Sequence, residues 1–207
     1  MRRPGRTLPL LTALALTAAL AWPVDAALAR RVGRAPSAPE DAGPVAVPAA
    51  GSIEVAFSPD EGSEGLVIKV IDSARSELRV MAYTFTSAPV TRALLRARKR
   101  GVDVRLVVDE RSNTTEDRSG KARAALSALV DAGVQVRTIG VYAIAHDKVL
   151  IADASTVELG SFNYSDAAAH RNSENVLVNW HNPQLARVYL AHFERNYRQS
   201  VAYETRY

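Results

Sequence analysis

The chain has 207 residues, of which 47% are hydrophobic and 23% charged, and its formal net charge is +4. This size and composition favour one ordinary globular domain with additional segments. The chain has no cysteine, which excludes disulfides, thiolate nucleophiles and cysteine-based zinc or iron–sulfur sites.

The N-terminus has the pattern of a secretory signal. Three arginines lie among the first six residues, and residues 8–22 form an apolar run rich in Leu and Ala. Small residues acceptable to a signal peptidase follow at Ala26 and Ala29. We predict a signal peptide over residues 1–26 and an exported protein, periplasmic or secreted, without stable membrane insertion. An uncleaved anchor is the alternative, disfavoured because the run is short for a bilayer.

Residues 27–51 are rich in alanine, proline and glycine and are interpreted as a flexible linker. We predict a single globular domain over residues 52–207. Its first half alternates strands with amphipathic helices. Ser63 is expected to cap the first helix and Ser87 the second, and Gly101 is expected to end the second. The predicted strands here are residues 53–57, 78–85 and 102–108.

The second half continues the alternation. Residues 111–121 are polar and charged and predict a mobile loop, and the residues after it predict a helix over 122–132. A last helix is expected to begin at Pro183. Further strands are predicted at residues 134–139, 148–152, 156–159 and 174–180. This order favours an α/β fold with a mixed, largely parallel β-sheet sandwiched between helices.

One stretch, residues 145–163, concentrates the candidate chemistry. It reads AHDKVLIADASTVELGSFN and has the spacing H-x-K-x4-D-x6-G-S-x-N. The fixed positions are His146, Lys148, Asp153, Gly160, Ser161 and Asn163. A polar loop beside two strands is the simpler alternative, but such a loop does not require these residue types at this spacing.

His146 and Lys148 are two residues apart, so on a strand both side chains point to the same face. A lysine neutralises the non-bridging oxygens of a phosphate as a point charge. A histidine titrates near neutral pH and can attack phosphorus or donate a proton. The pair therefore predicts a phosphate-directed catalytic site.

The remaining motif positions complete a cradle for an anion. Gly160 lets the backbone approach an anion closely, and Ser161 and Asn163 can donate hydrogen bonds to phosphate oxygens. Asp153 would face away from His146 on a regular strand, so we expect it to support the site by capping a turn or pairing with a cation. A purely structural role for Asp153 remains open.

Glu174 begins an apolar strand, where a carboxylate usually needs a partner. We interpret it as the acceptor of the second N–H of His146, with a solvated strand end as the alternative. The other histidines lack the spacing of metal ligands, and no metal site is predicted. Charged residues at 111, 118, 121 and 123 could guide a polyanion, although charged loops are usually just solvated.

The motif resembles the HKD signature of the phospholipase D superfamily. The likeness extends over residues 55–87, 101–110 and 145–178, which are similar to the small, exported, single-motif bacterial endonucleases of that superfamily. The resemblance implies a phospholipase D-like fold, a phosphohistidine formed on His146 and phosphate binding by Lys148 and Asn163 with Ser161 beside them. It also implies that Glu174 orients His146 and that neither a metal nor another cofactor is required.

One motif copy implies a homodimer, in which the partner's histidine protonates the leaving oxygen. One histidine cannot easily attack on one side of phosphorus and protonate on the other, so in-line geometry favours the same assembly. We therefore predict a metal-independent, largely non-specific endonuclease acting on DNA, with RNA as a further substrate. A phospholipid hydrolase and a non-catalytic nucleic-acid-binding module are the alternatives, and the first is disfavoured because such members mostly carry two motifs.

Overall fold

The computed structural model describes residues 43–205, so the predicted signal peptide and the first part of the predicted linker lie outside the described residues. Residues 43–51 form neither helix nor strand. In chain order the elements are β1 (Ser52–Ser58), α1 (Ser63–Ser73), β2 (Glu77–Ala82), α2 (Ala88–Lys99), β3 (Asp103–Asp109), α3 (Glu110–Asn113), α4 (Lys121–Asp131), β4 (Gln135–Ile139), β5 (Lys148–Ala152), β6 (Thr156–Gly160), α5 (Asp166–His170), β7 (Glu174–Trp180), α6 (Pro183–Gln199) and β8 (Val201–Ala202).

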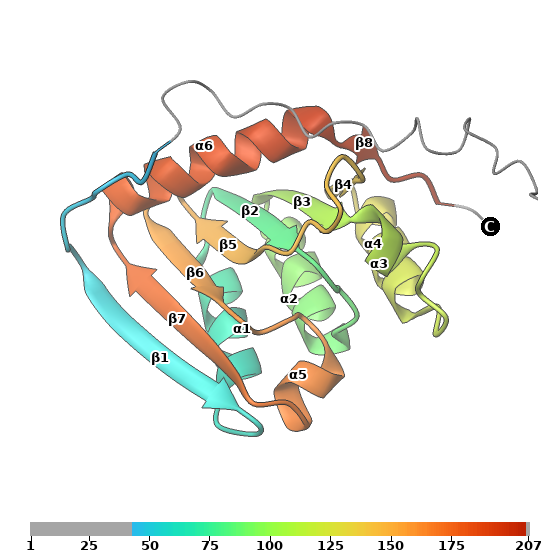
Figure 1. The fold of residues 1–207 in the computed structure, drawn as a ribbon, viewed down its shortest axis with the longest axis horizontal. Coiled ribbons are helices and arrows are strands. Elements are labelled where there is room, and N and C mark those ends of the chain that lie inside the picture. The colour runs from blue at the N-terminus through green and yellow to red at the C-terminus, as the bar shows by residue number, and fades with distance from the viewer. Residues whose placement is uncertain (1–42, 206–207) are drawn as a thin grey trace, which may run out of the picture. The chain divides into compact units, whose positions relative to one another are not determined.

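The strands of the described region form one sheet in the order β1-β7-β6-β5-β2-β3-β4-β8 (Figure 1). Only β2, β3 and β4 pair in parallel, and the other neighbouring strands pair antiparallel. The predicted mixed α/β sheet is confirmed, with a smaller parallel share than expected. Helical crossovers join β2 to β3 and β3 to β4, whereas a three-residue turn joins β5 to β6 and makes them antiparallel.

Helices cover both faces of the sheet, as Figure 1 shows. One core joins the inner sides of α1, α2 and α4 to the sheet, and Val70, Leu94 and Leu126 are fully buried in it. A smaller core on the other face packs Phe193 of α6 against Val149 and other strand residues. Burial on both faces explains why β5 reads as a continuous apolar run.

The predicted helix caps had different outcomes. The Ser87 side chain accepts a hydrogen bond from the backbone N–H of Val90 at 3.1 Å and caps α2 as expected. Ser63 was the wrong residue for α1, because Gly62 in the left-handed conformation (φ 95°) occupies the cap position. The Ser63 hydroxyl is buried and has no hydrogen-bond partner within residues 43–205.

Strand β2 ends at Ala82, three residues earlier than predicted. Beyond it, the side chain of Asn113 takes the place of a neighbouring strand as hydrogen-bond partner of the backbone. The Asn113 amide donates to the Tyr83 carbonyl oxygen at 2.5 Å and accepts from the Phe85 N–H at 2.8 Å. Asn113 belongs to α3, so the predicted loop over 111–121 contains part of a helix as well as buried, hydrogen-bonded residues. With four residues, α3 is too short to leave a periodic sequence signal.

Candidate active site

The strand directions bring five segments to one edge of the sheet. At this edge β2 and β3 end, β5 begins, β6 ends and β7 begins. The register places Ala82, Lys148, Gly160 and Val176 in one row across four strands. His146, Ser161 and Glu174 therefore come from three chain segments but gather beside Lys148.

Lys148 is 94% buried at the start of β5. Its Nζ donates to the backbone carbonyl oxygen of His146 at 2.9 Å and lies 5.2 Å from the ring centre of Tyr83. Burial lowers the pKa of Lys148, and the carboxylates of Asp147 and Glu174 act against that shift. An ammonium that has lost most of its hydration interacts more strongly with a phosphate than an exposed one does.

The His146 side chain is exposed at the same edge. Within the described chain its imidazole makes no hydrogen bond or ion pair, and its ring contact is with Tyr83 at 4.7 Å between centroids. Both imidazole nitrogens are thus free to meet a substrate. Lys148 holds the backbone of His146, and the Tyr83 ring contacts both side chains.

Glu174 is held by other partners than the expected one. Its carboxylate accepts from the Ser161 hydroxyl at 2.6 Å and from the Asn172 amide at 3.0 Å. The hydrogen bond predicted between Glu174 and His146 is not formed in this structure. The single hydroxyl proton of Ser161 is directed at Glu174, so Ser161 presents its oxygen, which accepts from the backbone N–H of Asn175 at 3.1 Å.

Asn163 follows β6 and is half-buried. Its Oδ1 atom is buried and is one of the few side-chain atoms in residues 43–205 without a hydrogen-bond partner. Its backbone oxygen accepts from the N–H of Ser165 at 2.7 Å, which fixes the turn. Oδ1 can only accept a hydrogen bond, so the group of Asn163 that could donate to a phosphate oxygen is its amide nitrogen, which makes no hydrogen bond within residues 43–205.

Asp153 lies at the opposite end of β5, roughly 16 Å from Lys148 at 3.3 Å per residue. Its carboxylate accepts from the backbone N–H groups of Arg75, Ser76 and Glu77 and from the Ser76 hydroxyl, at 2.8–3.0 Å. Burial opposes ionisation of Asp153, but these hydrogen bonds outweigh it and lower the pKa. The structure therefore separates Asp153 from the other motif residues and gives it a turn-capping position.

Gly160 is also explained by packing within the sheet. A Cβ atom there would lie 2.2 Å from the backbone oxygen of Asn175 on the neighbouring strand. The residue is thus required for the close approach of β6 and β7, and the approach of an anion predicted at Gly160 is not needed to account for it.

Two further residues hold the site and were not recognised in the sequence. Asp109, buried at the end of β3, accepts from the Ala145 N–H at 2.9 Å and from the Ser112 N–H at 2.8 Å, which anchors the segment that carries His146. Asn113 holds Tyr83 as described above. Asp109 could have been found, because carboxyl ends of parallel strands meet at one edge of a sheet.

Glu158 on β6 is fully buried behind the site. One carboxyl oxygen accepts from the hydroxyl of the buried Tyr164 at 2.7 Å, and the other has no partner in the described region. Burial raises the pKa of Glu158 to about 8, and the hydrogen bond from Tyr164 acts against that rise. At pH 7 the group is mostly a neutral carboxylic acid.

Residues 43–205 contain no cluster of three histidine or acidic side chains placed to hold a metal ion. Among these residues no helix has the length and apolar character needed to cross a membrane.

Comparison with known proteins places the chain in a family. The family model described as "Cardiolipin synthase, PLD-like domain" matches residues 67–197. A protein named "Phospholipase D" from Rickettsia typhi is 34% identical over 151 residues, which are 72% of this chain and 71% of the relative. The chain belongs to the phospholipase D superfamily. This membership confirms the resemblance noted in the sequence and identifies the fold as phospholipase D-like.

A second relative of the same name, from Rickettsia felis, is 37% identical over 126 residues, 61% of this chain. The chain spans 60% of that relative's length. Among solved structures, Nuc from Salmonella typhimurium, described as a phospholipase D family member, has 42% sequence identity and a TM-score of 0.71. The match covers 74% of this chain and 98% of Nuc. The superfamily and the Nuc likeness support a hydrolase.

Proposed function

We propose that the protein is a metal-independent phosphodiesterase that hydrolyses DNA, and RNA as a further substrate, through a covalent intermediate on His146. The observation that carries the proposal is the exposed, unbonded imidazole of His146 beside the buried ammonium of Lys148. The amide nitrogen of Asn163 supplies a hydrogen-bond donor for phosphate at the same edge. The likeness to Nuc supports the choice of a nucleic-acid substrate.

The proposed reaction has two displacements at phosphorus. An imidazole nitrogen of His146 attacks, the bond between phosphorus and the leaving oxygen breaks, and a second histidine gives a proton to that oxygen. Water then attacks the phosphohistidine while the second histidine accepts the water's proton, and the phosphorus–nitrogen bond breaks to restore His146. Lys148 stabilises the charge that develops on the non-bridging oxygens.

The second histidine would be His146 of another copy across a two-fold axis. An apolar stripe on the edge strand β1 supports such an assembly: Ile53, Val55 and Phe57 are 67%, 54% and 50% exposed. They alternate with Glu54 and Ala56, which face α1, so the stripe lies on the α6 side of the sheet. The strand ends at Ser58, which pairs with Glu174, so the stripe leads to the site.

Plasmid degradation in excess chelator tests the chemistry. The parent protein is expected to cut and His146→Ala to be inactive, with both proteins having the same oligomeric state. Loss of cutting on chelation would contradict the metal-independent mechanism. If neither DNA nor RNA is cut while headgroup is released from phospholipid vesicles, the phosphodiesterase chemistry stands and the substrate is a lipid.

Light scattering on a Val55→Glu variant tests the assembly. We expect a dimer for the parent and a monomer with at least tenfold lower activity for the variant, because a buried carboxylate without a partner opposes association. Thr115→Glu, a charge added at another exposed position, is the control. An active monomer would contradict the shared site.

We further propose that the protein is exported and that its signal peptide is removed. The intact mass of protein recovered from the periplasm or medium would distinguish cleavage after Ala26 from cleavage after Ala29, and recovery of the full-length chain only from the cytoplasm would contradict export.

A further inference from the structure

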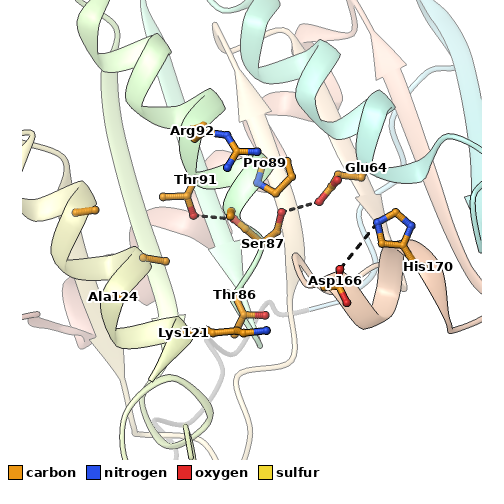
Figure 2. A pocket seen from close by; sticks show the side chains of 13 residues that line it. Glu64, Thr86, Ser87, Pro89, Thr91, Arg92, Lys121, Ala124, Asp166 and His170 are labelled. Carbon is orange, nitrogen blue, oxygen red and sulfur yellow. Dashed lines mark hydrogen bonds and ion pairs between the residues drawn. The ribbon is translucent and has the colours of Figure 1, made fainter. Parts of the chain in front are cut away.

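A cavity of about 520 Å³ lies between α2, α4 and α5, and none of His146, Lys148, Asn163 and Glu174 lines it. Figure 2 shows its walls: the first turn of α2 with Pro89 and Arg92, α4 with Lys121 and Ala124, and α5 with Asp166 and His170. Ala128 of α4 also lines it. Its volume is within the range of small-molecule sites, and its floor of alanine and proline side chains is apolar.

The charged groups around this cavity differ in whether they have partners within the protein. Its acidic and histidine groups already have partners: Glu64 accepts from the Ser87 hydroxyl at 2.6 Å, and His170 contacts Asp60 at 2.6 Å and Asp166 at 4.0 Å. The two cations that line the cavity, Arg92 and Lys121, make no side-chain hydrogen bond or ion pair within residues 43–205. The cavity thus combines an apolar floor with two unpaired positive charges.

Backbone hydrogen bonds connect the segment that lines the cavity to the segment that carries Asn163. The N–H groups of Thr86 and Ser87, both of which line the cavity, donate to the carbonyl oxygen of Tyr164 at 2.8 Å, and Asn163 directly precedes Tyr164. Thr86 also lies three residues after Tyr83, a span of at most about 10 Å. This distance is about three steps of a stacked nucleic-acid strand.

We propose that this cavity binds an unpaired nucleotide of the substrate strand, a few steps from the phosphate held by Lys148. The proposal rests on the nuclease function and deepens it. A flat base meets the apolar floor, while Arg92 and Lys121 neutralise the phosphates on either side of it. An acyl chain suits the cavity less well, because ionic groups surround a short apolar floor. Since a paired base cannot enter, the enzyme should prefer single strands.

Binding to the full-length protein carrying His146→Ala tests the cavity without cleavage. The probes are a fluorescein-labelled thymidine octamer and an abasic octamer with the same phosphates, followed by fluorescence anisotropy. Ala128→Phe fills the cavity without changing charge, and Ala128 is exposed, so the fold should tolerate it. Arg92→Ala with Lys121→Ala removes the two cations, and Lys99→Ala, at the exposed far end of α2, is the matched control.

Ala128→Phe is expected to raise the Kd for the thymidine octamer about tenfold and to leave that for the abasic octamer unchanged, because only the base enters the cavity. Removing Arg92 and Lys121 should weaken both probes, and Lys99→Ala should change either Kd less than twofold. Equal Kd values for the octamer with and without Ala128→Phe would overturn the proposal. So would reduced lipid headgroup release by Ala128→Phe with octamer binding unchanged.

The small diester bis(4-nitrophenyl) phosphate separates the two proposals. With His146 intact, the cavity variants should hydrolyse it at the parent rate, because it fits the reaction centre alone. If the parent hydrolyses the diester and DNA but Ala128→Phe binds the octamer normally, the cavity proposal fails and the function stands. If the parent hydrolyses neither, the function fails, and the cavity proposal, which rests on it, fails too.

Discussion

The two ends of the β5–β6 hairpin carry residues of the same short motif but have opposite hydrogen-bonding character. At the turn end, the Asp153 carboxylate accepts hydrogen bonds from four donors on residues 75–77. At the open end, the His146 imidazole has no hydrogen bond in the described chain and a buried oxygen of Asn163 has no partner. The motif therefore combines one end whose polar groups are hydrogen-bonded within the protein with an open end that carries the candidate reactive groups.

This difference separates stability from chemistry within one motif. Groups whose hydrogen bonds are completed by the protein stabilise the fold, whereas polar groups left incomplete at an accessible edge stay available to a substrate. Substitutions at the open end should reduce turnover without unfolding the protein, and those at the turn end should do the reverse. Substitutions at His146, Lys148 and Asp153 test this contrast, and one at Glu158 tests a separate effect of pH.

His146→Ala should give the largest effect, a loss of about 10⁴-fold in kcat with DNA or bis(4-nitrophenyl) phosphate, because the attacking nitrogen is removed. The urea midpoint should stay the same, since the side chain is exposed. His181→Ala, another exposed histidine, is the control and should keep full activity. Residual activity above about one tenth would exclude His146 as the nucleophile.

Lys148→Met should lower kcat/KM by about 10²- to 10³-fold through loss of charge stabilisation. The pH profile gives a second test. Burial lowers the pKa of Lys148, so this lysine should lose its proton at a lower pH than an ordinary lysine does. The activity of the parent should fall on the alkaline side at that lower pH. Lys148→Arg, which stays charged, should retain part of the activity and extend it to higher pH. An alkaline limb at the same pH in both proteins would contradict this assignment.

Asp153→Asn should cost about 2 kcal/mol of unfolding free energy at neutral pH with activity per folded molecule unchanged. Asparagine tolerates the positive φ of 50° at this position, so the change removes the charge and one accepting oxygen without adding backbone strain. The pKa of Asp153 is lowered on folding, so the difference should be full above the unfolded pKa and disappear as the pH falls through the folded one. Ala154→Asn, in the same turn and also at φ 50°, is the control for urea unfolding.

A reduced kcat for folded Asp153→Asn, with its urea midpoint unchanged, would assign Asp153 to the chemistry and remove the contrast.

Glu158→Gln should change the pH dependence of stability. The folded pKa of about 8 exceeds the ordinary 4.5, so the unfolded chain releases this proton first and the parent loses stability as the pH rises between those values. The slope is up to about 1.4 kcal/mol per pH unit. Glu158→Gln should remove it in urea titrations at pH 5, 6, 7 and 8, whereas an unchanged slope would place the ionisation elsewhere.

The sequence by itself determined the family and the alternation of strands and helices, and it pointed to the candidate pair, His146 and Lys148. Local patterns sufficed, because the spacing of His146 and Lys148 on a strand fixes their shared face, and Ser87 caps α2 through a contact three residues away. The short elements α3, α5 and β8 were missed, since two to five residues carry no periodicity.

Only the tertiary structure decided which polar residues are satisfied. The partners of Asp153 lie 76 to 78 positions away in sequence, and Asp109 reaches Ala145 across 36 positions. Glu174 binds Ser161 in place of the predicted His146 because the ladder of β6 and β7 sets the two side by side. The sheet order determines such contacts between distant segments, and a sequence pattern within one segment does not contain it.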